Sequence, residues 1–382
     1  MTLAHARQPL MPAPTRFIGL MSGTSLDGVD GVLARFDAHG RLQVEHHAFL
    51  GFDPSLRAQL LALNQQGDNE LHRAALAANA LARRYAEVVQ ELLRQASCTA
   101  QDIAAIGAHG QTVRHQPQLH DGMGYTLQLN NPALLAELTG IDVVADFRTR
   151  DLAAGGQGAP LVPTFHQGVF GRSDAMVAVL NIGGISNLSV LCPNGGVRGW
   201  DCGPGNALMD HWCQQHTGQA FDEDGAWARS GQPIAALLER LLQEDYLRQP
   251  PPKSTGRDLF NPAWLQARLQ GFETAAPADV QATLTRFTAE ACVRDVQAHA
   301  PGAQTLIVCG GGALNGQLMA GLRMGLPKMT VVNSGDQGLP PLQVEAAAFA
   351  WLAFKCLRRE TASLPSVTGA QGARVLGAIY PR

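Results

Sequence analysis

Two segments of this chain share one pattern, in which an apolar strand enters a turn of small residues and a second strand leaves it. The first segment is 16–36 and the second is 176–191, so the pattern recurs about 160 residues further along the chain. Two short strand-like runs around a turn that contains glycine are typical of a β-hairpin. The recurrence predicts a duplicated architecture with two lobes, each built around one hairpin.

The turn of the first hairpin has a composition that suits anion binding. It consists of Ser22, Gly23, Thr24, Ser25, Leu26, Asp27 and Gly28. Glycine allows close approach of the backbone to a ligand, and successive backbone N–H groups in such a turn form an anion-binding concavity. The Asp27 carboxylate is a ligand type that Mg²⁺ accepts. The alternative reading of these residues is an ordinary hairpin with a polar turn.

Glycines also mark the second hairpin turn and a later loop. The turn contains Gly183 and Gly184, and the loop after the apolar run 306–309 contains Gly310, Gly311, Gly312 and Asn315. The chain has no Gly-x-x-x-x-Gly-Lys-[Ser/Thr] sequence, which excludes a P-loop. The acidic residue of a dinucleotide-binding fingerprint is replaced by the segment VNSG at 332–335. We therefore predict that the two hairpin turns grip a nucleotide's phosphates while the third loop closes over the nucleoside.

The composition excludes several classes of protein. Hydrophobic residues make up 46% and charged residues 16%, which indicates a globular chain long enough for two domains. The net charge of −3, without a basic run, gives no reason to expect nucleic acid or a membrane surface as partner. The seven cysteines form no C-x-x-C pair, and the N-terminus lacks the pattern of a signal peptide. We expect a cytoplasmic enzyme.

Nine ordered sequence blocks make the chain similar to the bacterial anhydro-N-acetylmuramic acid kinases. The blocks are SGTSLDGVD, AHGQT, DFRTRD, AAGGQGAPLVP, NIGGISN, WDCGPGN, KSTGRD, CGGGALN and VTGA, and the resemblance covers nearly all of 16–382. The family belongs to the superfamily of sugar kinases, actin and the heat-shock ATPases. The resemblance implies a two-lobed α/β fold of the duplicated ribonuclease H-like kind, with a cleft between the lobes.

Alternating strands and helices agree with an α/β fold. The glycine-rich stretch 153–160 suits a hinge or a close ligand approach, and a proline-rich candidate lid follows at 249–262. In the superfamily the C-terminal helix returns to the first lobe. We accordingly assign 15–135 together with 345–382 to the first lobe and 136–344 to the second.

Two carboxylates are the predicted catalytic residues. Asp201 precedes a Gly-Pro-Gly turn that opens a helix, and by itself would be read as a residue that orders the turn or caps the helix. The resemblance instead makes Asp201 the general base that takes a proton from a water attacking C1 of the sugar. Glu345 precedes a long apolar segment, where a carboxylate is favoured by the helix dipole. The resemblance gives it a supporting catalytic role at the sugar.

Four further residues are predicted substrate contacts. Arg148 and Asp151 could simply pair with each other on the surface, but a guanidinium also fits the lactyl carboxylate of the substrate. His109 follows a buried strand, where a histidine is more often structural. The resemblance places the block that contains His109 and Gln111 in the cleft.

Other polar residues are left outside the predicted site. Lys253 and Arg257 of the KSTGR block are interpreted as solvated. His115 and His120 lack a third ligand at metal-binding spacing, so we interpret them as non-metal residues.

The resemblance implies a specific reaction with ATP and Mg²⁺. The enzyme would open 1,6-anhydro-N-acetylmuramic acid hydrolytically and phosphorylate O6, giving N-acetylmuramic acid 6-phosphate in the recycling of cell-wall sugar. Two alternatives stay open: a sugar kinase that phosphorylates a free hydroxyl without hydrolysis, and a non-catalytic, actin-like nucleotide switch. A homodimer is suggested by resemblance alone.

Overall fold

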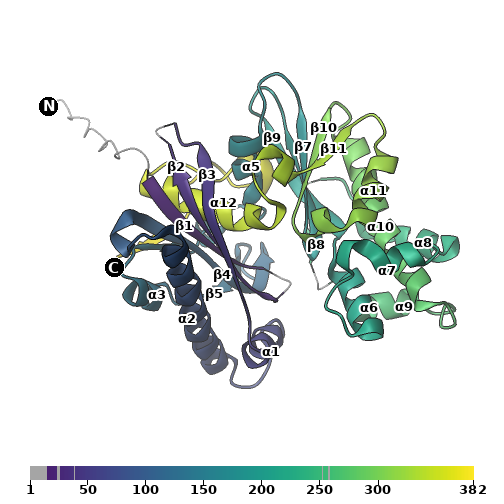
Figure 1. Cartoon of the computed structure of the whole chain (residues 1–382), viewed down its shortest axis with the longest axis horizontal. Coiled ribbons are helices and arrows are strands. Elements are labelled where there is room, and N and C mark those ends of the chain that lie inside the picture. The colour runs from purple at the N-terminus through teal and green to yellow at the C-terminus, as the bar shows by residue number, and fades with distance from the viewer. Residues whose placement is uncertain (1–14, 24–25, 38, 252, 257–258) are drawn as a thin grey trace.

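The computed structural model describes residues 15–23, 26–37, 39–251, 253–256 and 259–382. These residues form two β-sheets with helices between and around them (Figure 1). The strands of the first sheet are β1 (Thr15–Ser22), β2 (Gly28–Phe36), β3 (Leu42–Gly51), β4 (Ile103–Pro117), β5 (Gly124–Leu129), β6 (Val143–Ala145) and β12 (Ala378–Tyr380). The strands of the second sheet are β7 (Val177–Ile182), β8 (Ile185–Leu191), β9 (Val197–Pro204), β10 (Thr305–Cys309) and β11 (Thr330–Asn333).

The two sheets repeat one topology. In the first sheet, β1, β2 and β3 form an antiparallel meander, and β4 and β6 follow in parallel on the other side of β1. In the second sheet, β7, β8 and β9 form the same meander, and β10 and β11 follow in parallel on the other side of β7. The shared order confirms the duplicated α/β architecture that the two hairpins predict.

Helices cover the sheets and connect them. The α-helices are α1 (Pro54–Ala62), α2 (Glu70–Ala96), α3 (Pro132–Thr139), α4 (Thr149–Ala153), α5 (Val162–Phe170), α6 (Ala207–Thr217), α7 (Ala226–Ser230), α8 (Ala235–Leu242), α9 (Pro262–Arg268), α10 (Pro277–His299), α11 (Gly316–Gly325), α12 (Val344–Leu357) and α13 (Pro365–Thr368). Short 3₁₀ helices are η1 (Ala100–Asp102), η2 (Glu223–Gly225), η3 (Asp245–Arg248), η4 (Gly311–Leu314), η5 (Ser334–Gln337) and η6 (Pro341–Gln343).

The alternation of side chains along each central strand divides the core into layers. In β1, Phe17 packs with α12 while Ile18 packs with α2 on the other face. In β7, Val179 joins the same cluster as α12, while Leu180 joins the cluster of α10 and α11. Successive residues of a strand face opposite sides of its sheet. Helix α12 therefore shares one hydrophobic core with both sheets (Figure 1).

Helix α12 is apolar on nearly all sides because protein surrounds it. Its buried residues include Ala346, Phe349 and Trp351, and they lie in a cluster with strands of both sheets. A helix that is hydrophobic all round is normally a buried one. A Cβ added to Gly19 of β1 would overlap the carbonyl oxygen of Ala346, so this glycine permits the close approach of α12 to the sheet.

The structure corrects some boundaries. The assignment of 136–344 to the second lobe fails at its start, because β6 pairs in parallel with β4 of the first sheet. The strand expected to end at Ala108 continues to Pro117, so His109 and Gln111 lie within β4. Gly110 adopts φ +82° within this long strand, a backbone conformation that glycine accepts without strain. Within the described part of the chain, no helix is long and apolar enough to cross a membrane.

Candidate functional site

Asp201 lies near the end of β9, before the turn that opens α6. Its Oδ2 accepts a hydrogen bond from the backbone N–H of Thr255 at 3.0 Å. Burial raises the pKa of Asp201 from 3.8 to about 6, and this is opposed by the Thr255 hydrogen bond and by the positive charges of Arg148 and Lys253. A carboxylate with a pKa near neutrality is a better proton acceptor than an ordinary aspartate. The geometry makes Asp201 a candidate general base.

Arg148 follows β6 and is held in place by His109 and a backbone carbonyl. Its Nε and Nη2 donate to Nε2 of His109 at 3.1 and 3.0 Å, and its Nη1 donates to the carbonyl oxygen of Gly158 at 2.8 Å. Burial and the charge of Arg148 hold the pKa of His109 well below its usual value. The imidazole is therefore neutral, as an acceptor must be. Its ring also packs on Phe349 of α12, with 4.6 Å between centroids.

Glu345, at the start of α12, links the two sheets. Its Oε1 accepts a hydrogen bond from Nδ2 of Asn181, at the end of β7, at 3.3 Å. Burial and the negative charges of Asp30 and Asp27 raise the pKa of Glu345, while the Asn181 hydrogen bond and the charge of Arg148 lower it. Two carboxylates of the first hairpin and an amide of the second hairpin thus interact with one carboxylate.

Gln111 holds the first hairpin turn. Its side chain bonds Ser22 through Oε1 and donates to the carbonyl oxygen of Gly23 at 3.1 Å. The side chain is buried, so in this structure it positions the turn. Leu26 is buried with φ +56°, and Gly28 begins β2. Thr24 and Ser25 of the predicted turn lie outside the described residues.

Asp151 is fully buried, contrary to the surface pair considered with Arg148. Its Oδ2 accepts from the backbone N–H of Gly158 at 2.8 Å, and its Oδ1 accepts from the hydroxyl of Thr368 at 2.9 Å. Both carboxylate oxygens are thereby occupied. Because Gly158 in turn binds Arg148, the structure places Asp151 behind Arg148 and gives it no surface position.

The glycine loops of the second sheet lie against one another. Asn206 N–H donates to the carbonyl oxygen of Gly183 at 2.7 Å, and Ala207 N–H donates to that of Gly184 at 3.2 Å. A Cβ on Gly310, which has φ +76°, would come within 2.5 Å of Asn181 Oδ1. The second hairpin turn, the start of α6 and the third loop therefore meet at the carboxyl ends of β7 and β10.

The remaining residues of the third loop are partly committed to local structure. Gly311 and Gly312 begin η4, and Gly312 is buried against Ile182. The Asn315 side chain accepts from the backbone N–H of Leu318 at 3.0 Å and so caps α11. Their contact with a nucleotide stays a prediction.

Lys253 differs from its prediction, because it is buried and not solvated. Arg257 lies outside the described residues. His115 bonds Thr126 at 3.0 Å and His120 bonds Gln116 at 2.7 Å. Across the described ranges, no group of three or more histidine, cysteine, aspartate or glutamate residues is arranged to hold a metal by itself.

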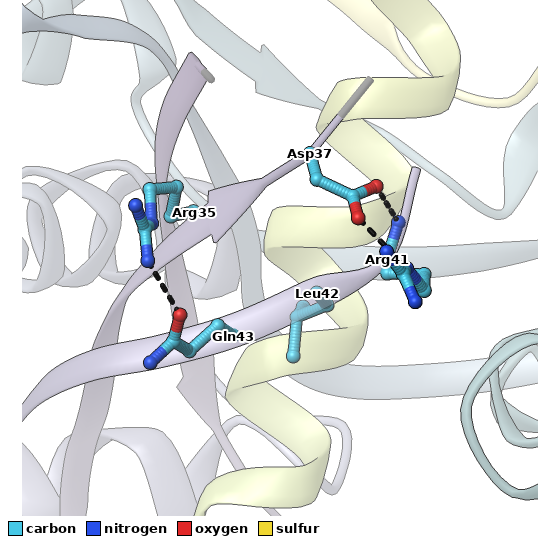
Figure 2. A pocket seen from close by; sticks show the side chains of 5 residues that line it. All are labelled: Arg35, Asp37, Arg41, Leu42 and Gln43. Carbon is cyan, nitrogen blue, oxygen red and sulfur yellow. Dashed lines mark hydrogen bonds and ion pairs between the residues drawn. The ribbon is translucent and has the colours of Figure 1, made fainter. Parts of the chain in front are cut away.

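A separate surface pocket lies at the other end of the first hairpin, where β2 ends. Figure 2 shows the ion pair between Asp37 and Arg41, with 2.7 Å between Oδ2 and Nε, and the hydrogen bond from Arg35 to Gln43. Leu42 completes the lining. The pocket is remote from the glycine turn because Gly28 begins β2 and Phe36 ends it. We assign it no role.

Three residues of the site were not among the predicted ones. Asn181 begins the NIGGISN block of the second hairpin, but its bond to Glu345 joins positions far apart in the sequence. Asp30 lies in β2 as an isolated polar residue, and burial raises its pKa while a 3.0 Å contact to His47 lowers it. Thr255 binds Asp201 through its backbone N–H. A backbone contact does not depend on the type of side chain, so the sequence does not indicate it.

Solved structures show only a weak likeness to this chain. The activator of the 2-hydroxyisocaproyl-CoA dehydratase from Clostridium difficile, with bound ADPNP, gives a TM-score of 0.47 at 13% identity and covers 89% of this chain and 95% of its own. A ROK family glucokinase from Streptomyces griseus, in complex with glucose and AMPPNP, gives 0.42 at 11% identity and covers 88% and 98%. At these TM-scores and identities, the likeness supports no conclusion about the function of this chain.

Comparison of sequences is decisive. A protein of Variovorax paradoxus named anhydro-N-acetylmuramic acid kinase is 65% identical over 370 residues, which are 96% of this chain and 98% of the relative. A protein of the same name from Burkholderia cenocepacia is 56% identical over 380 residues, 98% of each chain. The family model described as anhydro-N-acetylmuramic acid kinase matches residues 15–382. The chain therefore belongs to the anhydro-N-acetylmuramic acid kinase family.

Proposed function

We propose that this chain uses ATP to convert 1,6-anhydro-N-acetylmuramic acid into N-acetylmuramic acid 6-phosphate, with hydrolytic opening of the anhydro bridge. The names of the relatives and the family match over residues 15–382 support the substrate and a phosphoryl transfer to it. The observation that carries the mechanism is the carboxylate of Asp201, whose pKa burial raises to about 6.

The reaction balances with one water per ATP. The water oxygen bonds C1 of the sugar as the bond between C1 and O6 breaks, and Asp201 takes the proton of the attacking water. O6 then takes the γ-phosphoryl group and ADP leaves. A general base of this kind contributes about 10²–10⁴-fold to a rate. The Thr255 hydrogen bond fixes the orientation of the accepting carboxylate.

Arg148 is the proposed contact of the substrate's lactyl carboxylate. A guanidinium can bind a carboxylate through two parallel hydrogen bonds. The side chain of Arg148 is held by hydrogen bonds to His109 and Gly158. Its charge interacts with those of Glu345 and Asp201. We assign His109 and Asp151 the role of holding Arg148, and Gln111 that of holding the first turn.

Asp27, Asp30 and Glu345 do not form a metal cage by themselves, but Asp30 and Asp27 both interact electrostatically with Glu345, and this negative charge would favour a magnesium ion bound together with ATP. Burial raises the pKa of Glu345 most, and the negative charges of Asp30 and Asp27 add to this shift, so a cation nearby would be favoured. Mg²⁺ is usually bound by one or two carboxylates plus substrate phosphates, so a complete protein cage is not required. When bound, the ion would offset the charge of the phosphates during transfer. We propose Asp27 as a direct or water-mediated ligand.

The glycine turns are the proposed phosphate contacts. In this proposal the turn from Ser22 to Gly28 belongs to the first lobe, and Gly183–Gly184 and Gly310–Asn315 belong to the second. The second-lobe loops meet where β7 and β10 end, and Asn181 connects that point to Glu345. Closure of two such lobes would exclude bulk water from the transfer. A cytoplasmic location, supported by seven free cysteines, and a homodimer are part of the proposal.

Isotope labelling tests the reaction. The purified protein is incubated with Mg-ATP and the anhydro-sugar in ¹⁸O-water, and the product is analysed by mass spectrometry. The proposal requires one ¹⁸O at C1 and none in the phosphate bridge. A phosphorylated sugar with its anhydro ring intact would identify a kinase without hydrolysis. ATPase activity that is indifferent to the sugar would identify a nucleotide switch.

A further inference from the structure

Lys253 is a buried cation with an acidic partner far along the chain. Its side chain is 2% exposed, and its Nζ lies 3.3 Å from Oδ1 of Asp295 on α10. The same Nζ lies 5.2 Å from the centroid of the Tyr246 ring. Burying an ammonium group is costly unless it is paired. The position of Lys253 is therefore specified by the fold, in a segment that the sequence suggested as a lid.

The segment that carries Lys253 binds Asp201 through backbone groups. The Lys253 carbonyl oxygen accepts from the backbone N–H of Asp201 at 3.1 Å. Two residues later, the Thr255 N–H donates to the Asp201 carboxylate at 3.0 Å. Tyr246 donates its hydroxyl to the carbonyl oxygen of Asp201 at 2.8 Å. The N–H, the carbonyl and the carboxylate of one residue are thus all held.

Asp295 connects this segment to β9 by a second route. Its Oδ2 accepts from Nε1 of Trp200 at 3.0 Å, while its Oδ1 faces Lys253. Trp200 precedes Asp201 and is buried. The contacts form a closed ring that runs from Asp201 through Trp200, Asp295 and Lys253 back to Asp201.

We propose that Lys253 is a positioning residue for the reaction: its ion pair with Asp295 fixes segment 253–255 and thereby the direction of the Asp201 carboxylate. Lys253 does not touch the substrate in this scheme. The inference rests on the proposed role of Asp201 as the base.

The charge of Lys253 has a consequence that a purely structural role would lack. The charged and titratable groups around Asp201 are Lys253, Arg148 and the phenol of Tyr246, and Glu345 shares Arg148. Lys253 and Arg148 both favour the ionised carboxylate, against its burial. Burial raises the pKa of Tyr246, so its phenol stays neutral. Removing the Lys253 charge should therefore raise the pKa of the base.

The test compares Lys253→Met with the double variant Lys253→Met/Asp295→Asn. The single variant leaves Asp295 buried without its cation, and we expect it to be less stable. The double variant removes both charges and keeps an oxygen that can accept from Trp200, so it restores stability. Lys355→Met is the matched control, because Lys355 also pairs with a carboxylate, Glu360, and also lies over an aromatic ring, 5.3 Å from the centroid of Trp351.

We expect the double variant to lose kcat by about 10²-fold, the scale of a displaced catalytic group, with KM for ATP unchanged. The acid limb of its pH profile should move upward by about one pH unit. The control should match the wild type in both. A double variant with wild-type kcat and pH profile overturns the inference, as does a fall in kcat matched by an equal rise in KM for ATP. Full turnover in Asp201→Asn would instead overturn the proposed function.

Discussion

Replacing Asp201 by asparagine should make the protein inactive and more stable at the same time. The substitution keeps an oxygen that can accept from the Thr255 N–H and removes only the charge. That charge is costly, because burial raises the pKa of Asp201 despite two cations and a hydrogen bond that act in the other direction. Turnover should fall by about 10²–10⁴-fold, the usual contribution of a general base.

The size of the stability gain follows from the pKa. The folded chain holds the Asp201 proton up to about pH 6, whereas the ordinary value is 3.8. At about 1.36 kcal/mol per pKa unit, ionising this group lowers the free energy of unfolding by about 3 kcal/mol. Because the pKa of Asp201 is higher in the folded than in the unfolded state, the protonated group makes its full contribution to stability below pH 3.8. This contribution is lost as the pH rises through about 6. The variant should therefore exceed the wild type by up to about 3 kcal/mol at pH 8, and match it near pH 4.

Urea unfolding at several pH values measures this difference. Tryptophan fluorescence is a suitable signal, because four tryptophans lie in or against the hydrophobic cluster of the second sheet, which carries Asp201: Trp200, Trp212, Trp227 and Trp264. The free energies are extrapolated linearly to zero denaturant from that transition. The comparison between variant and wild type removes contributions shared by both.

Two results would refute the reasoning. If the variant and the wild type differ by the same amount at pH 4 and pH 8, the Asp201 carboxylate does not titrate abnormally. If the variant is more stable at pH 8 but retains kcat, the buried carboxylate is real but is not the base. A variant that is more stable but inactive would instead show that the charge of Asp201 serves catalysis although it lowers the free energy of unfolding.

Three other predictions concern neighbouring groups. In the wild type, kcat should fall about tenfold per pH unit below pH 6, because only ionised Asp201 accepts the proton, as a pH–rate profile will show. Arg148→Lys keeps the charge but loses the fork, so KM for the anhydro-sugar should rise about 10–100-fold in steady-state kinetics; an unchanged KM removes the lactyl contact. Gly310→Ala should lower stability by about 1–3 kcal/mol and raise KM for ATP, since a Cβ would approach Asn181 Oδ1 and Ile182 O. Gly338→Ala is its control, because Gly338 also has positive φ but no atom within 4 Å of the added Cβ.

Much of the fold could be predicted from local sequence. Both hairpins follow the strand–turn–strand pattern expected from the sequence, and the recurrence of this pattern indicates the duplication. The boundary between the two lobes was harder to predict from the sequence. The short strand β6 carries only three residues, and its place beside β4 is decided by pairing with a strand far away in the chain. Nothing within 136–145 distinguishes the two sheets.

The sequence indicates several of the side chains near the site, but not which of them hold the surrounding loops. The charge of Arg148 interacts with those of Asp201 and Glu345. Asp151 and Gln111 instead hold neighbouring loops, a difference that depends on hydrogen bonds formed only in the folded chain. Lys253 looked solvated because its partner Asp295 lies 42 residues away, on α10.

The two cations that favour ionised Asp201 come from different halves of the fold. Arg148 follows β6 of the first sheet, whereas Lys253 is tied to α10 and β9 beside the second sheet. A shift of one half relative to the other would therefore move Arg148 away from Asp201 and leave Lys253 in place. With Lys253 alone, burial would dominate and the carboxylate would hold its proton to higher pH. Asp201 is thus more fully protonated when the halves are apart and more fully ionised when Arg148 is beside it. Its readiness to accept a proton is therefore tied to the arrangement that also brings the substrate contacts together.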